Sequence, residues 1–146
     1  MLEESFEKLY LTFRANYYRR MVEKIGPRQG SLSATESFCV ELIYLLGQPT
    51  MSEFADYLGI SIPNANYKVA SLVRKGYVIK TTSSQDKREQ LLTVTDKFTA
   101  YYGLNNTDNE HLMKSIRSTF SPKEVEQLDA TIQKVLALMK TEESHD

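Results

Sequence analysis

Cysteine and histidine are scarce in this chain of 146 residues, which has one cysteine and two histidines. The single cysteine, Cys39, cannot form a disulfide within the chain and is typical of a reducing, cytoplasmic setting. His111 and His145 stand in no pattern that a metal site requires. The sequence also lacks a Ser/His/Asp set, a Cys/His set, a glycine-rich phosphate loop and a paired-carboxylate motif. We therefore expect no enzyme, no catalytic residue, no metal and no cofactor.

Long hydrophobic runs are also absent, and neither sign of charge dominates. No apolar stretch approaches the roughly 18 residues of a membrane span, and the acidic, amphipathic start MLEESFEKLY is unlike a signal peptide. The chain has 18 basic and 19 acidic residues. Residues 61–97 hold seven basic and three acidic side chains, a net charge of +4, which leaves −5 for the rest. A basic middle between acidic ends is what a localised phosphate-binding surface needs.

Three capping boxes predict where helices begin. In such a box a Ser or Thr side chain caps the backbone N–H three residues on, and the Glu at that position reaches back. The boxes are SATE (33–36), TMSE (50–53) and SPKE (121–124). They predict that three helices begin directly after Ser33, Thr50 and Ser121, the last of them with Pro122 as its first residue. Gly47 and Gly59 are expected to end the first two of these helices.

Apolar spacing predicts the other helices. Apolar side chains at three- and four-residue steps indicate a first helix of roughly twenty residues that ends at Gly26-Pro27. A helix capped by Ser61 stops at Gly76. Thr95 caps a long helix, which the stretch GLNNTDN (103–109) kinks or interrupts. Apolar side chains in the second and third helices are expected at Phe38, Leu42, Leu45, Leu46, Phe54, Tyr57 and Leu58.

Between the helices that start at Ser61 and Thr95, two β-prone runs predict a hairpin. The runs are residues 77–82 and 89–94, and a polar loop joins them. The fold class is therefore mostly α with a small β-hairpin. A helix, a turn, a second helix and a basic hairpin, in that order, are typical of a winged helix-turn-helix.

Three motifs carry a resemblance to a known family. They are Leu72-x-x-x-Gly76 at the helix end, Asp86-x-Arg88 at the hairpin tip, and Leu91-x-Thr93-x-Thr95-Asp96-Lys97 on the return strand. With this order of elements, the chain resembles MarR-family transcriptional regulators over nearly its whole length. One position differs: Phe98 stands where the family usually has glycine.

The resemblance implies a single MarR-like domain over residues 1–146. Residues 33–97 are expected to form the winged helix-turn-helix DNA-binding lobe, and residues 1–25 and 98–141 the helical dimerisation region. The implied function is a cytoplasmic, sequence-specific transcriptional regulator that binds a pseudo-palindromic operator in double-stranded DNA as a homodimer, with half-sites about ten base pairs apart. Repression is the simpler mode, because a small dimer across a promoter blocks polymerase unaided. The rival interpretation is a winged-helix protein-interaction module without specific DNA binding, although such a module needs no arginine-tipped basic hairpin.

The helix that starts at Ser61 is expected to enter the major groove. Asn64 and Asn66 suit paired hydrogen bonds to adenine, and Ile62 and Pro63 suit thymine methyl groups. Alternatively, the two asparagines are solvated and only cap locally. At the hairpin tip Arg88 is expected to reach the minor groove, and the resemblance implies that Asp86 orients it. The DNA-binding candidates are Ser61, Pro63, Asn64, Asn66, Tyr67, Lys68, Arg74, Lys75, Asp86, Lys87 and Arg88. Of the phosphate candidates, Ser33, Arg74, Lys75, Lys80 and Lys87 are the lesser ones, and for each of them a solvated face is an equal alternative.

The terminal helices carry apolar stripes that predict the dimer interface. Ordinary core packing is the alternative. The stripes comprise Leu2, Phe6, Leu9, Tyr10 and Phe13 on the first helix and Leu128, Ile132, Val135, Leu136 and Met139 on the last.

A small aromatic or lipophilic effector is the expected means of control. Aromatic side chains with phenolic groups could line its cavity, or they could equally be core and interface residues. Arg14, Arg19 or Arg20 could pair with a ligand carboxylate, or lie at the surface. Cys39, among apolar neighbours, is expected to be an inert core residue rather than an oxidant sensor. The candidate ligand-binding residues are Phe13, Tyr17, Tyr18, Phe38, Tyr44, Tyr101 and Tyr102.

Overall fold

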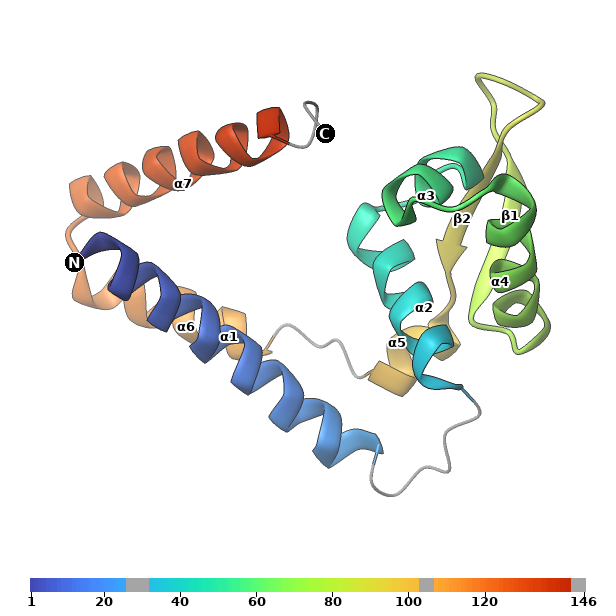
Figure 1. The fold of residues 1–146 in the computed structure, drawn as a ribbon. Helices are drawn as coiled ribbons and strands as arrows, with labels where there is room; N and C mark the ends of the chain where they lie inside the picture. The colour runs from blue at the N-terminus through green and yellow to red at the C-terminus, as the bar shows by residue number, and fades with distance from the viewer. Residues whose placement is uncertain (26–31, 103–106, 143–146) are drawn as a thin grey trace. The chain divides into compact units, whose positions relative to one another are not determined.

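The computed structural model describes residues 1–25, 32–102 and 107–142 (Figure 1). Two compact units are present, Met1–Leu104 and Asn105–Asp146. The first unit contains α1 (Leu2–Ile25), α2 (Ala34–Leu46), α3 (Met51–Leu58), α4 (Ile62–Arg74), β1 (Val78–Thr82), β2 (Gln90–Val94) and α5 (Asp96–Tyr102). The second contains α6 (Thr107–Thr119) and α7 (Pro122–Glu142).

This order confirms the predicted fold class, mostly helical with one hairpin. Gly26-Pro27, expected to end the first helix, lies outside the described residues. So do residues 103–106 of the stretch expected to kink or interrupt the long helix. The described helices before and after residues 103–106 are α5 and α6, so the last three residues of the stretch, 107–109, belong to α6.

All three predicted capping boxes are present. The hydroxyls of Ser33 and Thr50 accept from the backbone N–H groups of Glu36 and Glu53, and each glutamate accepts the N–H of its capping residue. The box that starts at Ser121 opens α7 in the same way. Each box satisfies two backbone donors that a helix start leaves unpaired, so these boundaries are determined locally.

The hairpin is antiparallel and is attached to the segment that begins α3. Val78 pairs with Val94 and Thr82 with Gln90, so each strand starts one residue later than predicted. The Leu92 N–H donates to the Pro49 carbonyl at 2.9 Å. These bonds fix the base of the hairpin against the helix-turn-helix.

The core of the first unit lies between α2, α3, α4 and the hairpin. Its fully buried side chains include Phe54 on α3 and Phe98 on α5. The Phe98 ring centroid lies 4.5 Å from that of Tyr102 and 5.4 Å from that of Tyr44. An aromatic side chain at position 98, where MarR-like sequences usually have glycine, therefore fills the core beneath α5.

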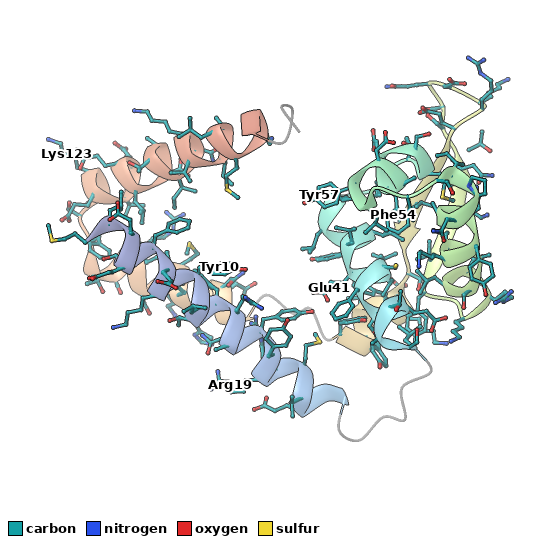
Figure 2. The ribbon with its side chains drawn as sticks, in the orientation of Figure 1. Tyr10, Arg19, Glu41, Phe54, Tyr57 and Lys123 are labelled. Carbon is teal, nitrogen blue, oxygen red and sulfur yellow. The ribbon has the colours of Figure 1, made fainter. Side chains whose placement is uncertain are left out.

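On two helices, α2 and α3, some of the apolar side chains expected inside lie at the surface. Phe38 and Leu45 on α2 are 66% and 69% exposed, because the buried face of this helix is formed by Cys39, Val40 and Ile43. On α3, Phe54 lies inside the lobe while Tyr57 lies on the outer side (Figure 2). Leu58 is also exposed.

In the second unit, α7 presents an apolar stripe that is exposed within the single chain. The stripe consists of Leu128, Ile132, Val135, Leu136 and Met139.

None of the helices in the described part of the protein is long and apolar enough to cross a membrane.

Candidate nucleic-acid interface

The helix α4 buries one side and exposes the other, as the sequence predicts for a recognition helix. Ala65, Val69 and Leu72 are fully buried. The Ser61 hydroxyl caps the helix by accepting the Asn64 N–H at 3.3 Å, and Pro63 occupies the first turn. Because the buried face anchors the helix, the side chains of its first turn are presented outwards.

The two asparagines of this first turn differ in their surroundings. The Asn64 side chain is exposed. The half-buried Asn66 amide nitrogen donates to the Ile62 carbonyl at 3.1 Å, a local bond within the helix. A side-chain amide has two donors and two acceptor lone pairs, so this bond leaves Asn66 a further donor and its oxygen. Local bonding and base contact are therefore compatible at this position.

The hairpin tip is organised by two short side chains. The Ser83 hydroxyl accepts from the backbone N–H groups of Gln85 and Asp86. The Asp86 carboxylate accepts the Arg88 backbone N–H at 2.9 Å and its Nε at 3.3 Å. Asp86 thus orients the guanidinium group, as the family resemblance implies. The Arg88 side chain is 91% exposed and is free to meet a phosphate or a groove.

A hollow of about 220 Å³ brings the hairpin tip and the recognition helix together. Ile62 and Asn66 line it from α4, and Lys87 and Arg88 line it from the tip. Two predicted sets of residues, of which Asn66 and Lys87 are 21 positions apart in the sequence, therefore share one surface.

The remaining candidates on α4 lie elsewhere. Tyr67, Lys68 and Arg74 line a second hollow of about 250 Å³, formed with Ser33 and Thr35 at the start of α2. Tyr67 is 82% exposed. This second hollow lies between the start of α2 and α4, and no residue of the hairpin lines it.

Lys75 was a lesser phosphate candidate, with a solvated face as the equal alternative, and in the structure its ammonium group contacts Glu36 on α2. The Nζ atom lies 2.8 and 3.1 Å from the two carboxylate oxygens, and the Ser71 hydroxyl also donates to this carboxylate. The bonds from Lys75 and Ser71 lower the pKa of Glu36 to about 2. The sequence motif identified Glu36 only as a helix cap, and the long-range ion pair was missed.

The predicted ligand-binding aromatics are divided between core and surface. Tyr102 is buried and its hydroxyl donates to the Ser37 carbonyl at 3.3 Å; burial raises its pKa to about 12. Tyr101 is packed against Tyr77 and Tyr102. The Tyr17 hydroxyl donates to Glu41, and burial and this bond raise the pKa of Tyr17. Phe13, Tyr18 and Tyr44 are exposed.

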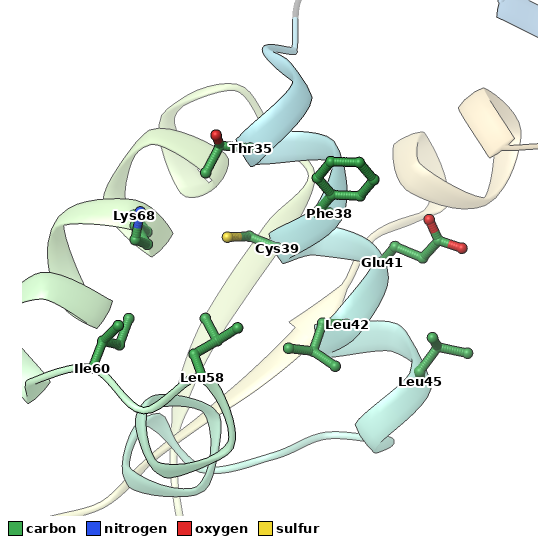
Figure 3. A pocket seen from close by; sticks show the side chains of 9 residues that line it. All are labelled: Thr35, Phe38, Cys39, Glu41, Leu42, Leu45, Leu58, Ile60 and Lys68. Atoms are coloured by element: carbon green, nitrogen blue, oxygen red, sulfur yellow. The ribbon is translucent and has the colours of Figure 1, made fainter.

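Only Phe38 among these aromatics lines a groove of about 440 Å³ on the same lobe (Figure 3). Cys39 and Leu42 point from α2 towards Lys68 and Ile60 across it. Burial raises the pKa of the Cys39 thiol, as expected of a core cysteine. The groove residues that were not ligand-binding candidates are Thr35, Cys39, Glu41, Leu42, Leu45, Leu58, Ile60 and Lys68, the last of which was a candidate for DNA binding.

Among the residues that the structure describes, no three side chains of His, Cys, Asp or Glu gather as metal ligands would. The surface is instead one of amides, hydroxyls and exposed bases on a helix and a hairpin, which suits recognition of a polyanion.

Comparisons with known proteins agree with this architecture. The sequence model of the MarR family matches residues 32–90. A comparison with curated proteins found no match. Among solved structures, Streptococcus pneumoniae FabT in complex with DNA has a TM-score of 0.59 and 20% identity, covering 97% of this chain and 99% of its own. A mutant MepR from a multidrug-resistant Staphylococcus aureus clinical isolate has a TM-score of 0.59 and 17% identity, covering 92% and 96%.

A third similar structure extends the comparison to another organism. The Thermotoga maritima transcriptional regulator Tm0710 has a TM-score of 0.51 and 19% identity, covering 98% of this chain and 99% of its own. At these identities the likeness concerns the fold, whereas the family match concerns the sequence of the helix-turn-helix and hairpin. The winged-helix segment of the chain thus matches the MarR family in sequence, and the chain shares its fold with these structures.

Proposed function

We propose that this protein is a sequence-specific DNA-binding transcriptional regulator that acts as a dimeric repressor. The observation that carries the proposal is the shared hollow between α4 and the hairpin tip, lined by Asn66, Lys87 and Arg88. It joins groups suited to base edges with groups suited to phosphates or a minor groove. FabT, a protein with a similar fold, has been crystallised in complex with DNA, which supports DNA binding as the function.

In this arrangement the buried side of α4 holds the helix while its first turn meets the major groove. Asn64 and Asn66 supply sequence readout through their amides. Arg88, oriented by Asp86, enters the adjacent minor groove or binds its phosphates. Residues of the second hollow, Tyr67 and Arg74, contact the flanking backbone.

The test is selection of operators from a pool of random duplexes long enough for two half-sites about ten base pairs apart. Binding of the selected duplex is then measured at two salt concentrations against a scrambled competitor. We expect tight binding that survives the competitor and a footprint with two-fold symmetry. Equal, strongly salt-dependent binding to every duplex would contradict the proposal.

The effector site is the groove between α2 and α4 rather than the predicted aromatic cavity. Its walls are largely apolar, and two of its lining residues, Phe38 and Leu45, are 66% and 69% exposed. Lys68 is the one basic side chain of the lining and is half-buried. In the part of the protein described, no carboxylate forms an ion pair with it. The lining has one other charged side chain, Glu41, which accepts the Tyr17 hydroxyl. Lys68 is thus the charged group of the lining without such a bond, which favours a small lipophilic ligand with one anionic group.

Occupancy of this groove would reach the recognition helix directly, because Lys68 is on α4 and Ile60 is in the turn before it. Decanoate, decanol and decyltrimethylammonium share a ten-carbon chain and differ in the charge of the head group. Calorimetry with these three probes therefore separates the effect of the ligand's charge from that of its apolar chain. We expect decanoate to bind best, and Lys68→Met to weaken it about tenfold while Lys123→Met, on α7, does not. Equal binding of the three probes, or no effect of Lys68→Met, would rule out the assigned ligand class.

A further inference from the structure

The end of the recognition helix α4 is closed first by its own backbone. The Gly76 N–H donates to the Val73 carbonyl and the Tyr77 N–H to the Leu72 carbonyl, both at 3.0 Å. Gly76 adopts a φ of +81°. This is the Schellman arrangement, which satisfies two of the carbonyls that a helix end leaves unpaired.

The next three carbonyls are bound by residues that follow the hairpin. Lys97 Nζ donates to the Lys75 carbonyl at 2.7 Å, and Thr95 Oγ1 donates to the Gly76 carbonyl at 2.6 Å. The Thr95 backbone N–H donates to the Tyr77 carbonyl at 3.0 Å. Thr95 precedes α5 as predicted, but its hydroxyl serves the end of α4. Together, Thr95 and Lys97 form a clamp on this helix end.

The position of Lys97 suits the charge at a helix end. A cation near the last carbonyls interacts favourably with the negative end of the helix dipole. The Lys97 ammonium also lies 4.7 Å from the centroid of the Tyr77 ring, within the range of a cation–π contact. Its Cδ lies 3.6 Å from where a β-carbon on Gly76 would be, so the side chain lies along the turn.

This clamp ties the recognition helix to α5, and α5 is itself held in the lobe. Phe98, next to Lys97, is fully buried, and the Tyr102 hydroxyl bonds the Ser37 carbonyl of α2. The C-terminal end of α4 is thus held against the core through its hydrogen bonds to the start of α5. The first turn of α4, with Asn64 and Asn66, lies at the opposite end of the helix.

We propose that Lys97 and Thr95 are positioning residues for DNA recognition, which hold the end of α4 and so set the angle of its first turn against the bases. The inference rests on the proposed function. At 1.5 Å per residue, thirteen residues span about 20 Å, so a tilt of about 10° moves the first turn by about 3 Å. A hydrogen bond to a base edge does not survive such a displacement, whereas phosphate contacts made by long flexible side chains adapt to it.

The test uses the whole protein with paired variants. Lys97→Met and Thr95→Val remove the donors and keep the side-chain bulk, while Lys97→Arg and Thr95→Ser restore them. Lys123→Met, on the exposed start of α7, controls for the loss of one positive charge. Two properties are measured: amide hydrogen exchange at residues 75–77 without DNA, and affinity for the selected operator and a scrambled duplex at two salt concentrations.

We expect Lys97→Met and Thr95→Val to speed exchange at Gly76 and Tyr77 and to weaken operator binding roughly threefold to tenfold. Affinity for the scrambled duplex and the salt dependence should stay unchanged, and the two conservative variants should recover wild-type values. An equal loss on both duplexes, with a salt slope reduced by about 1, would make Lys97 a phosphate contact instead. Unchanged exchange and affinity would overturn the clamp.

The exchange measurement keeps this inference separate from the proposed function. If the wild-type protein prefers no duplex, the proposed function fails, and the role in DNA recognition fails with it. Exchange then still decides whether the clamp holds the helix end. If Lys97→Met does not fold, the pair Thr95→Val and Thr95→Ser decides the question, because Thr95 binds a different carbonyl.

Discussion

The Glu36 carboxylate on α2 holds the Lys75 ammonium group, at the end of the recognition helix, at a distance of 2.8 Å. The same carboxylate accepts the Ser33 N–H at 2.7 Å and the Ser71 hydroxyl. One side chain therefore caps the start of α2 and ties it to the last turn of α4. Its two partners on the recognition side, Ser71 and Lys75, are one helical turn apart.

This pair predicts an acid-sensitive contribution to stability. The pKa of Glu36 is lowered from 4.5 to about 2, so its stabilisation is fully present above about pH 4.5 and is lost as the pH falls towards 2. Glu36→Gln should lower the free energy of unfolding at pH 7 by about 1–2 kcal/mol. Urea denaturation at several pH values measures this. The difference from wild type should shrink below pH 4.5, whereas exposed Glu126→Gln should have little effect; a difference independent of pH would exclude the charge as its cause.

A second prediction concerns the hairpin tip. Arg88→Ala should weaken binding to all duplexes and lower the slope of log K against log salt by roughly 1, because one phosphate contact is lost. Arg88→Lys should keep the slope. Asp86→Asn should keep the slope and weaken binding less, because the guanidinium loses its orienting charge but remains. Titrations at several salt concentrations measure these slopes, and an unaltered slope in Arg88→Ala would remove Arg88 from the interface.

Local interactions explain why so much of the fold was predictable. The caps at Ser33, Thr50 and Ser121 join residues three apart, so the sequence shows both partners of each bond. The Asp86–Arg88 bond is equally local. The hairpin tip and the helix starts could therefore be predicted to within a residue or two.

Contacts between distant segments were not predictable in the same way. The stretch FCVELIYLL in α2 is apolar around much of the helix, so its periodicity does not select the face formed by Val40 and Ile43 over that of Phe38. Glu36 and Lys75 are 39 positions apart, and nothing local pairs them. The groove at Lys68 likewise requires side chains from three segments. Packing in three dimensions decides these features.

A third prediction concerns sequence readout. Asn64→Ala combined with Asn66→Ala should lower discrimination between the selected operator and single-base variants by roughly fivefold to a hundredfold, because paired bonds to adenine are lost. Binding to scrambled DNA should change little. Asn109→Ala, exposed on α6, is the matched control. Since Asn66 also bonds the Ile62 carbonyl, thermal melting is measured alongside; unchanged discrimination in a folded variant would leave the asparagines with a capping role only.

The last prediction concerns the exposed apolar stripe of α7. Ile132 is 47% exposed within the single chain, and Leu128 and Val135 lie on the same face. A surface of this kind is costly in water and is expected to be covered by a second copy. Ile132→Asp should therefore convert a dimer into a monomer, whereas Gln133→Asp adds the same charge on another face and should not.

Light scattering at micromolar concentration measures the mass of each variant. The monomeric Ile132→Asp protein should bind the two-fold operator more weakly and protect single half-sites, because each recognition helix then binds on its own. A wild-type protein that is monomeric at micromolar concentration would contradict the dimer. A wild-type dimer that persists in Ile132→Asp would instead move the interface away from α7, towards the apolar residues of α1, where Phe6→Asp repeats the test.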